Sequence, residues 1–316
     1  MNATDWGALA VNLAVTAAAA GAVLLATFAV ALRRGLHRIV DIAWGIAFSA
    51  VAAVTWLLSA GHGDDGRRLL VAAATVVWGL RLSAHIARRS RGHGEDPRYT
   101  ALLDKAPGNR TRYALRTVYL GQAALVWLIS LPVQAASYSF EPLGLLAFCG
   151  IAVWALGLGF EAVGDHQLAR FKADPANRGR IMDRGLWAWT RHPNYFGDSL
   201  VWWGVYLLAC TAWQPALAVL VSPVLMTLLL TVGSGKRLLE KHMADRPGYA
   251  VYTARTSGFL PLPPRHAVLR HGSQPVNPPR SGSGPDGADD RAGRDPEGAL
   301  GNGGARDLAA GGPECE

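Results

Sequence analysis

The sequence predicts an all-α, polytopic membrane protein with about seven transmembrane helices. Half of its 316 residues are hydrophobic and only 17% are charged, whereas a soluble domain carries roughly a quarter charged residues. Long apolar runs alternate with short, very basic loops. Because a transmembrane helix needs about 20 mostly apolar residues, this alternation indicates repeated crossing of a bilayer.

Seven apolar segments support that count, and the first of them raises the question of a signal peptide. It is too long for a signal peptide's apolar core, and its positive charges follow the run, so we interpret it as a retained helix. The last two segments are short, and Trp213, Gln214 and Pro215 between them predict the tight turn of a helical hairpin. The approximate ranges are 8–32, 39–60, 69–87, 113–133, 142–163, 199–212 and 215–232.

Arginine and lysine mark alternate loops and set the expected orientation. They follow the first segment, lie between the third and fourth and between the fifth and sixth, and follow the seventh. The positive-inside rule then places the N-terminus outside and the C-terminus in the cytoplasm, which agrees with an odd number of spans.

The composition also indicates where the domains end and which classes of partner to expect. Residues 1–264 form the predicted membrane domain, and residues 265–316, rich in Gly, Pro, Ser, Arg and Asp, are predicted to be a disordered tail. Three cysteines are too few and too scattered for a disulfide framework or a zinc site, so we expect no metal. The net charge of +8 flanks the spans, so we expect a lipid bilayer and no nucleic acid as partner.

Polar residues inside the apolar segments indicate where chemistry takes place, because they are costly in a bilayer. Asp41 begins the second segment, and Arg81 and His85 lie one turn apart on the third. Glu161 and Asp165 end the fifth. Each of these groups can be a helix cap or a local pair, but together they favour a shared polar cavity that opens to the cytoplasm.

The densest polar run is residues 185–198. Pro193 suits the first turn of a helix, and Arg191 and His192 beside a helix start favour an anion site. An interfacial belt of snorkelling and aromatic residues is the alternative. That alternative does not explain Asn194 and Asp198, which share one helical face.

Residues 236–261 form a second polar stretch after the last apolar segment. They predict an amphipathic segment that lies on the membrane and closes the cavity, or a simple interfacial tail helix. The chain has neither a Gly-x-Gly-x-x-Gly motif after a strand nor a Walker loop, so any nucleotide would bind among helix ends and loops.

These residues carry a resemblance to a known family. The run 185–198, preceded by residues 160–168 and followed by Glu240, Tyr249, Tyr252 and Pro261, resembles the steroid 5-alpha-reductase C-terminal-domain family. It is most similar to the bacterial branch known as DUF1295. The runs 41–45, 78–81 and 95–99 match less specifically, and the resemblance covers about residues 38–262.

The resemblance implies a seven-helix membrane enzyme that binds NADPH near the cytoplasmic side. It implies hydride transfer to a carbon–carbon double bond conjugated to a ketone in a small hydrophobic lipid. The Gln–Glu pair and the Tyr that the steroid enzymes use are not recognisable here, so the candidate catalytic residues are Glu161, Asp41 and His85. The candidate cofactor-binding residues are Asp165, Arg170, Lys172, Arg191, His192, Asn194, Tyr195, Asp198, Arg237, Glu240, Tyr249 and Tyr252.

Two other functions remain open at this stage. Isoprenylcysteine-methyltransferase-like enzymes share an Arg-His-Pro-x-Tyr motif and bind S-adenosylmethionine, although Asn194 favours the reductases. A non-enzymatic scaffold or transporter is the third, and the absence of a visible repeat argues against transport. The Ala- and Arg-rich composition favours a bacterial plasma membrane; a eukaryotic source would indicate the endoplasmic reticulum.

Overall fold

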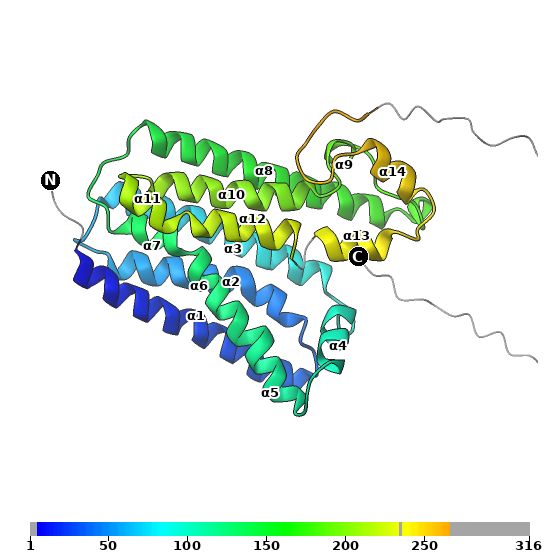
Figure 1. Ribbon diagram of the computed structural model, residues 1–316, viewed down its shortest axis with the longest axis horizontal. Helices are drawn as coiled ribbons and strands as arrows, with labels where there is room; N and C mark the ends of the chain where they lie inside the picture. The colour runs from blue at the N-terminus through cyan, green and yellow to red at the C-terminus, as the bar shows by residue number, and fades with distance from the viewer. Residues whose placement is uncertain (1–4, 234–235, 266–316) are drawn as a thin grey trace, which may run out of the picture. The chain divides into compact units, whose positions relative to one another are not determined.

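The computed structural model describes residues 5–233 and 236–265, and within these ranges the chain is a bundle of α-helices with no β-strand (Figure 1). The all-α prediction is therefore confirmed. The predicted tail lies outside the described residues, apart from Arg265. The helices are α1 Trp6–Arg34, α2 Ile39–Leu58, α3 Asp65–Arg89, α4 Pro97–Asp104, α5 Arg110–Ala114, a π-helical turn η1 Leu115–Leu120, α6 Gly121–Ile129, α7 Leu131–Ser137, α8 Leu145–Ala173, a 3-10 turn η2 Pro175–Asn177, α9 Leu186–Trp189, α10 Pro193–Ala209, α11 Trp213–Val219, α12 Val221–Thr231, α13 Lys236–Met243 and α14 Tyr249–Arg255.

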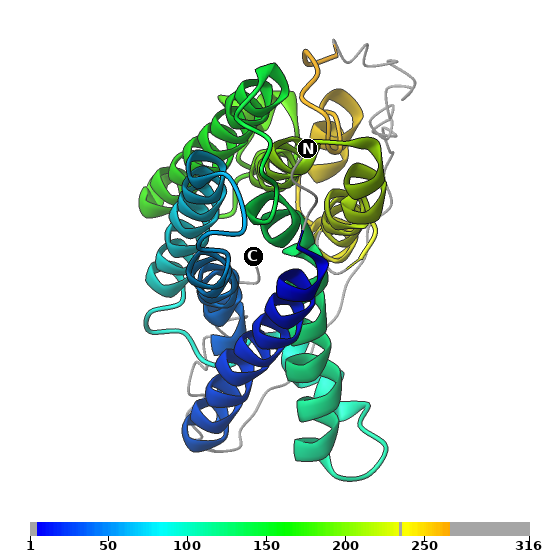
Figure 2. The same cartoon turned by 90° about the vertical axis from the view of Figure 1, so that its left-hand side faces the viewer.

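Six stretches of the described chain are long and apolar enough to cross a membrane, so the protein is a multi-pass membrane protein. They are α1, α2, α3, the continuous run Arg110–Ser137, α8 and the pair α11–α12. Figure 2 shows α1 beside the run Arg110–Ser137. The remaining predicted segment, 199–212, corresponds to α10. This helix has 17 residues and is therefore about 26 Å long. It lies inside the bundle, beside α8 (Figure 1).

The turn of the predicted hairpin is misplaced in the sequence-based interpretation. α10 ends at Ala209 and α11 already begins at Trp213, so the turn occupies residues 210–212. Pro215 lies in the first turn of α11, where a missing backbone N–H breaks no helical hydrogen bond. The proline therefore marks a helix start and not the turn that we predicted.

Short polar side chains define where several helices begin. Asp5 caps α1 by accepting from the Ala8 N–H, and Asp64 caps α3 by accepting from the Arg67 N–H. Asp96 and Asn109 cap α4 and α5 in the same way. These side chains satisfy N–H groups that have no partner inside the helix.

Helices α8 and α10 are held unusually close by glycines. A Cβ atom at Gly157 would lie 2.6 Å from the Gly197 carbonyl oxygen, and one at Gly204 would lie 2.7 Å from that of Gly150. A Cβ atom at Gly164, at the end of the contact, would lie 3.1 Å from the ring of Pro193. Small residues allow such backbone approach between membrane helices, and this contact fixes the acidic residues of α8 relative to those of α10.

Arg67 closes the end of the bundle that lies away from the basic loops. Its side chain is buried and donates hydrogen bonds to the carbonyl oxygens of Glu141 at 3.1 Å and Pro142 at 2.8 Å, and also to that of Leu208. It thereby ties α3 to the α7–α8 connection and to the end of α10.

Candidate functional site

Arg81 of α3 binds two carboxylates of α8 with one guanidinium group. Its Nη1 lies 2.5 Å from Glu161 Oε1, and its Nη2 contacts Asp165 Oδ2. Trp78 Nε1 donates to the second Glu161 oxygen at 3.1 Å, and His85 Nε2 lies 3.6 Å from Asp165 Oδ2. Glu161 is 2% exposed and Asp165 6% exposed. The one-turn spacing of Arg81 and His85 thus brings both to Asp165.

Asp198 of α10 adds a third buried carboxyl to this group. It is 9% exposed, and its Oδ1 has no hydrogen-bond partner in the described part of the chain. The charges of Arg81 and Asp165 both act on it. We call Glu161, Asp165 and Asp198, with Arg81 and His85, the acid cluster.

The acid cluster has more acids than bases. Three carboxyls face one guanidinium and one imidazole, and buried charges are stable only when they are paired and hydrogen-bonded. One carboxyl therefore remains without a strong countercharge. Such a group can hold a proton and deliver it to a reacting molecule.

Asp41 lies in a second polar group at the start of α2. Its carboxylate accepts from the Tyr99 hydroxyl at 2.5 Å and from Arg98 Nη2 at 2.9 Å. Burial and the neighbouring Asp41 charge raise the pKa of Tyr99 well above its usual value. The charges of Arg98, Asp41 and Asp198 all act on Tyr195, so this residue is within electrostatic reach of both groups. Sequence reasoning did not assign a role to Tyr99, although it follows the Glu-Asp-Pro-Arg run directly.

Arg191 binds a carboxylate of the chain itself. Its Nη2 lies 2.8 Å from Glu240 Oε1, and its Nη1 donates to the Thr256 carbonyl oxygen at 2.7 Å. His192 Nε2 lies 3.2 Å from the same Glu240 oxygen. The anion predicted at this helix start is thus supplied by α13, and Arg191 acts as a clamp between α10 and the C-terminal helices.

The titration of this clamp follows from its burial and its charges. Burial opposes ionisation of Glu240, but hydrogen bonds from His192 and Arg191 outweigh it and lower the Glu240 pKa to about 2. Burial lowers the pKa of His192, and Glu240 offsets this only in part. The His192 Nδ1 atom is buried and has no hydrogen-bond partner within the described ranges.

The C-terminal helices contact the chain at the start of α10. The Tyr252 hydroxyl donates to the Trp187 carbonyl oxygen at 2.7 Å, and the Thr190 hydroxyl donates to that of Phe259 at 2.9 Å. Residues 190 and 257 also form an isolated parallel bridge. We call residues 236–262 the cap.

An arginine-rich pocket of about 540 Å³ lies between the end of α8, the loop before α9, and α14. Arg180, Arg184, Arg255 and Tyr252 are among its lining residues. Arg255 pairs with Asp183. Arg180 and Arg184 are exposed, and no side-chain partner is found for them among the residues described. The positive-inside rule explains the basic residues of this loop by membrane topology alone; the position of Arg180 and Arg184 directly before the run 185–198 is the sequence feature that indicates a site.

The other candidates divide between the interior and the surface. Asn194 is half-buried and accepts from the Tyr195 N–H at 3.0 Å, while Tyr249 is buried in the cap. Arg170, Lys172 and Arg237 lie on the exposed surface, outside the acid cluster. The structure therefore brings Glu161, Asp165, His85 and Asp198 together, and places Asp41 in a separate group.

Sequence comparison shows the family to which the chain is related. Residues 27–256 match the family DUF1295, which is described as a protein family of unknown function. An uncharacterised protein of Schizosaccharomyces pombe is 26% identical over 250 residues, which cover 70% of this chain and 72% of the yeast protein. No solved structure gives a significant match.

Proposed function

Because the chain belongs to DUF1295, a steroid 5-alpha-reductase-like family, we propose that it is a membrane-embedded, NADPH-dependent reductase of a conjugated carbon–carbon double bond in a small hydrophobic lipid. We place it in the bacterial branch of that family and in the plasma membrane, on the Ala- and Arg-rich composition of the chain. The observation that carries the proposal is the acid cluster, in which Arg81 pairs with the buried Glu161 and Asp165 while the third buried carboxyl, Asp198, has no ion-pair partner among the described residues.

The acid cluster supplies what the reduction of an enone requires from a protein. Hydride addition to the β carbon places negative charge on the carbonyl oxygen, and a positioned proton donor stabilises that charge. Glu161 is our candidate donor: Arg81 and Trp78 hold its two oxygens in position, and the proton that it delivers is the one that the cluster retains because its three carboxyls outnumber their countercharges. His85 and Asp41 are the alternatives, and His85 already contacts the cluster through Asp165.

The chain also contains groups that suit a phosphorylated dinucleotide. Arg180 and Arg184 line the arginine-rich pocket without side-chain partners in the described chain, and guanidinium groups bind phosphates well. Asp198 Oδ1 has an unfilled acceptor position, and the Asn194 side chain lies one turn before it. When bound, NADPH supplies the hydride. In this proposal Arg180 and Arg184 bind its phosphates, and Asn194 and Asp198 orient the reactive end.

The clamp changes the role that we give to Arg191. Since Glu240 and the Thr256 carbonyl oxygen already occupy its donors, Arg191 positions the cap and excludes water from the start of α10. His192, Tyr249 and Tyr252 act in the same structural unit. Their contribution to NADPH binding is therefore indirect.

Ligand-dependent thermal stabilisation of the full chain in detergent tests the proposal. A ligand at a hundred times its Kd stabilises the folded state by about 2.7 kcal/mol, so NADPH raises the melting temperature and S-adenosylmethionine does not. Arg184→Ala and Asn194→Ala weaken the NADPH response, while the control Arg178→Ala, an exposed arginine in the same loop, does not. Stabilisation by S-adenosylmethionine alone contradicts the proposal and supports the methyltransferase. No response to either ligand supports a non-enzymatic role.

A further inference from the structure

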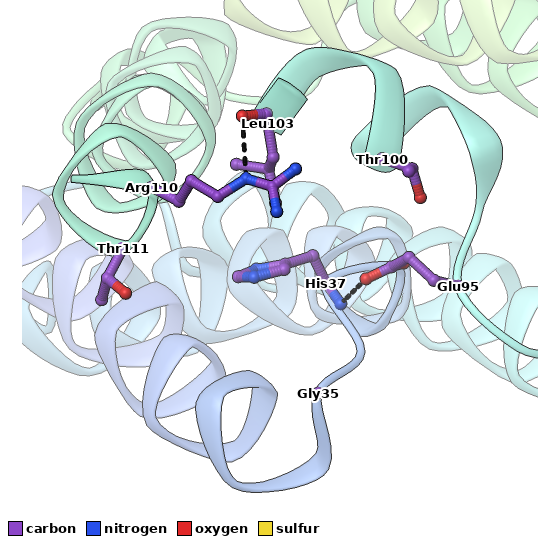
Figure 3. A pocket seen from close by; sticks show the side chains of 7 residues that line it. All are labelled: Gly35, His37, Glu95, Thr100, Leu103, Arg110 and Thr111. Carbon is purple, nitrogen blue, oxygen red and sulfur yellow. Dashed lines mark hydrogen bonds between the residues drawn. The ribbon is translucent and has the colours of Figure 1, made fainter. Parts of the chain in front are cut away.

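A second pocket, of about 290 Å³, contains no residue of the acid cluster and shares no lining residue with the arginine-rich pocket. Figure 3 shows the residues that line it, which are Gly35, His37, Glu95, Thr100, Arg110 and Thr111 together with Leu103, whose carbonyl oxygen accepts from Arg110 Nε at 3.2 Å. Neither the proposed reaction nor the cap uses any of these residues.

The pocket lies where three membrane-spanning segments end on the side of the basic loops. Gly35 directly follows α1, and His37 lies two residues before α2. Arg110 and Thr111 begin the span Arg110–Ser137. Since all three segments reach the bilayer surface here, the pocket is at the level of lipid headgroups.

The pocket offers several donors for a phosphate. Arg110 pairs with Asp104, but these side chains are 61% and 58% exposed, and exposed pairs of this kind contribute little. His37 Nδ1 lies 2.9 Å from the Tyr119 hydroxyl, which leaves Nε2 without a partner in the chain as described. The hydroxyls of Thr100 and Thr111 are likewise not engaged by any described residue.

Glu95 brings to the pocket a negative charge that the fold holds in place. The Glu95 carboxylate accepts from the backbone N–H groups of Arg38 and Asp96, each at 2.9 Å, and from that of His37. These bonds fix the carboxylate beside the pocket without supplying a full positive charge. Figure 3 shows Arg110 reaching over the His37 ring while Glu95 faces the His37 main chain. The pocket therefore presents a cation and an anion to one small volume.

We propose that this pocket binds the phosphoethanolamine headgroup of a bilayer phospholipid. Arg110, with His37 and the two threonine hydroxyls, binds the phosphate, and Glu95 binds the ammonium group. Leu32 of α1 and Leu120 of η1 are exposed apolar side chains on two of the segments that end at the pocket, and such side chains suit contact with the acyl chains. A glycerol headgroup lacks the ammonium and leaves Glu95 without a cation.

Native mass spectrometry of the full chain in detergent tests this directly, with phosphatidylethanolamine and phosphatidylglycerol of the same acyl chains. The expected result is one retained phosphatidylethanolamine per chain and on the order of tenfold weaker retention of phosphatidylglycerol, because one charge-assisted contact is missing. Arg110→Ala loses the retained lipid. The control Arg112→Ala, an exposed arginine of the same helix that does not line the pocket, keeps it.

Three outcomes would overturn the proposal. The first is equal retention of the two lipids by the unaltered chain, and the second is retention in Arg110→Ala that matches Arg112→Ala. The third is full occupancy by free phosphoethanolamine with no retained phospholipid, which would make the ligand a soluble phosphate compound. The readout is lipid retention, so it stands apart from the test with NADPH.

Discussion

The close contact of α8 with α10 predicts opposite effects for two neighbouring Gly→Ala substitutions. At Gly157 the new Cβ meets the main chain of Gly197 and Val201 at 2.6 Å, where no flexible side chain can move aside. At Gly159, two residues along the same helix, a Cβ has nothing within 4 Å. Alanine is favoured over glycine in a helix by about 1 kcal/mol at both positions, so this gain cancels in the comparison.

The difference between the variants therefore measures the contact itself. Overpacking costs about 1–3 kcal/mol, so Gly157→Ala should be less stable than Gly159→Ala by that amount. Gly159→Ala should equal or exceed the unaltered chain. Unfolding of both variants in the same detergent, followed by denaturant or heat, checks the order. If Gly157→Ala is as stable as Gly159→Ala, then α8 and α10 do not approach as closely as described.

Three further outcomes follow from the buried polar contacts. Arg81→Ala removes the countercharge of Glu161 and Asp165 and should cost about 3–5 kcal/mol of unfolding free energy; a loss below about 1 kcal/mol would contradict the pairing. Because burial lowers the His192 pKa, the unfolded chain binds the proton better, so stability falls as pH drops through the ordinary histidine value of about 6.5. His192→Gln should reduce the difference in melting temperature between about pH 7.5 and pH 5.5, and an unchanged difference would contradict this. Tyr252→Phe removes one buried hydrogen bond to the main chain and should cost about 0.5–1.5 kcal/mol, measured by the same unfolding assay; a more stable variant would speak against that bond.

Hydropathy predicted most of the fold because the bilayer leaves few alternatives to helices. The apolar segments place the spans within a few residues, as α1 and α2 show. The boundaries failed where polar residues extend a helix beyond its apolar part. α8 continues ten residues past the predicted end at Val163, and α10 begins at Pro193 with polar residues that hydropathy excludes.

The candidate site was less accessible to sequence reasoning, because its contacts join residues far apart in the chain. Helical spacing predicted that Arg81 and His85 share a face, but not that both meet Asp165. The partner of Arg191 lies 49 residues downstream of it, and no local pattern indicates such a contact. Side-chain type and position predicted that Arg191 binds an anion. In the structure that anion is the Glu240 carboxylate of the same chain.

That separation along the chain has a consequence for synthesis. The ribosome synthesises α10 before Glu240, Thr256 and Phe259, so a nascent chain with all of its spans translated still lacks the cap. Until then Arg191 and His192 have no carboxylate beside them. The start of α10 is therefore the last part of the site to gain its contacts. A chain truncated before residue 236 would retain its spans but lack the cap over this start.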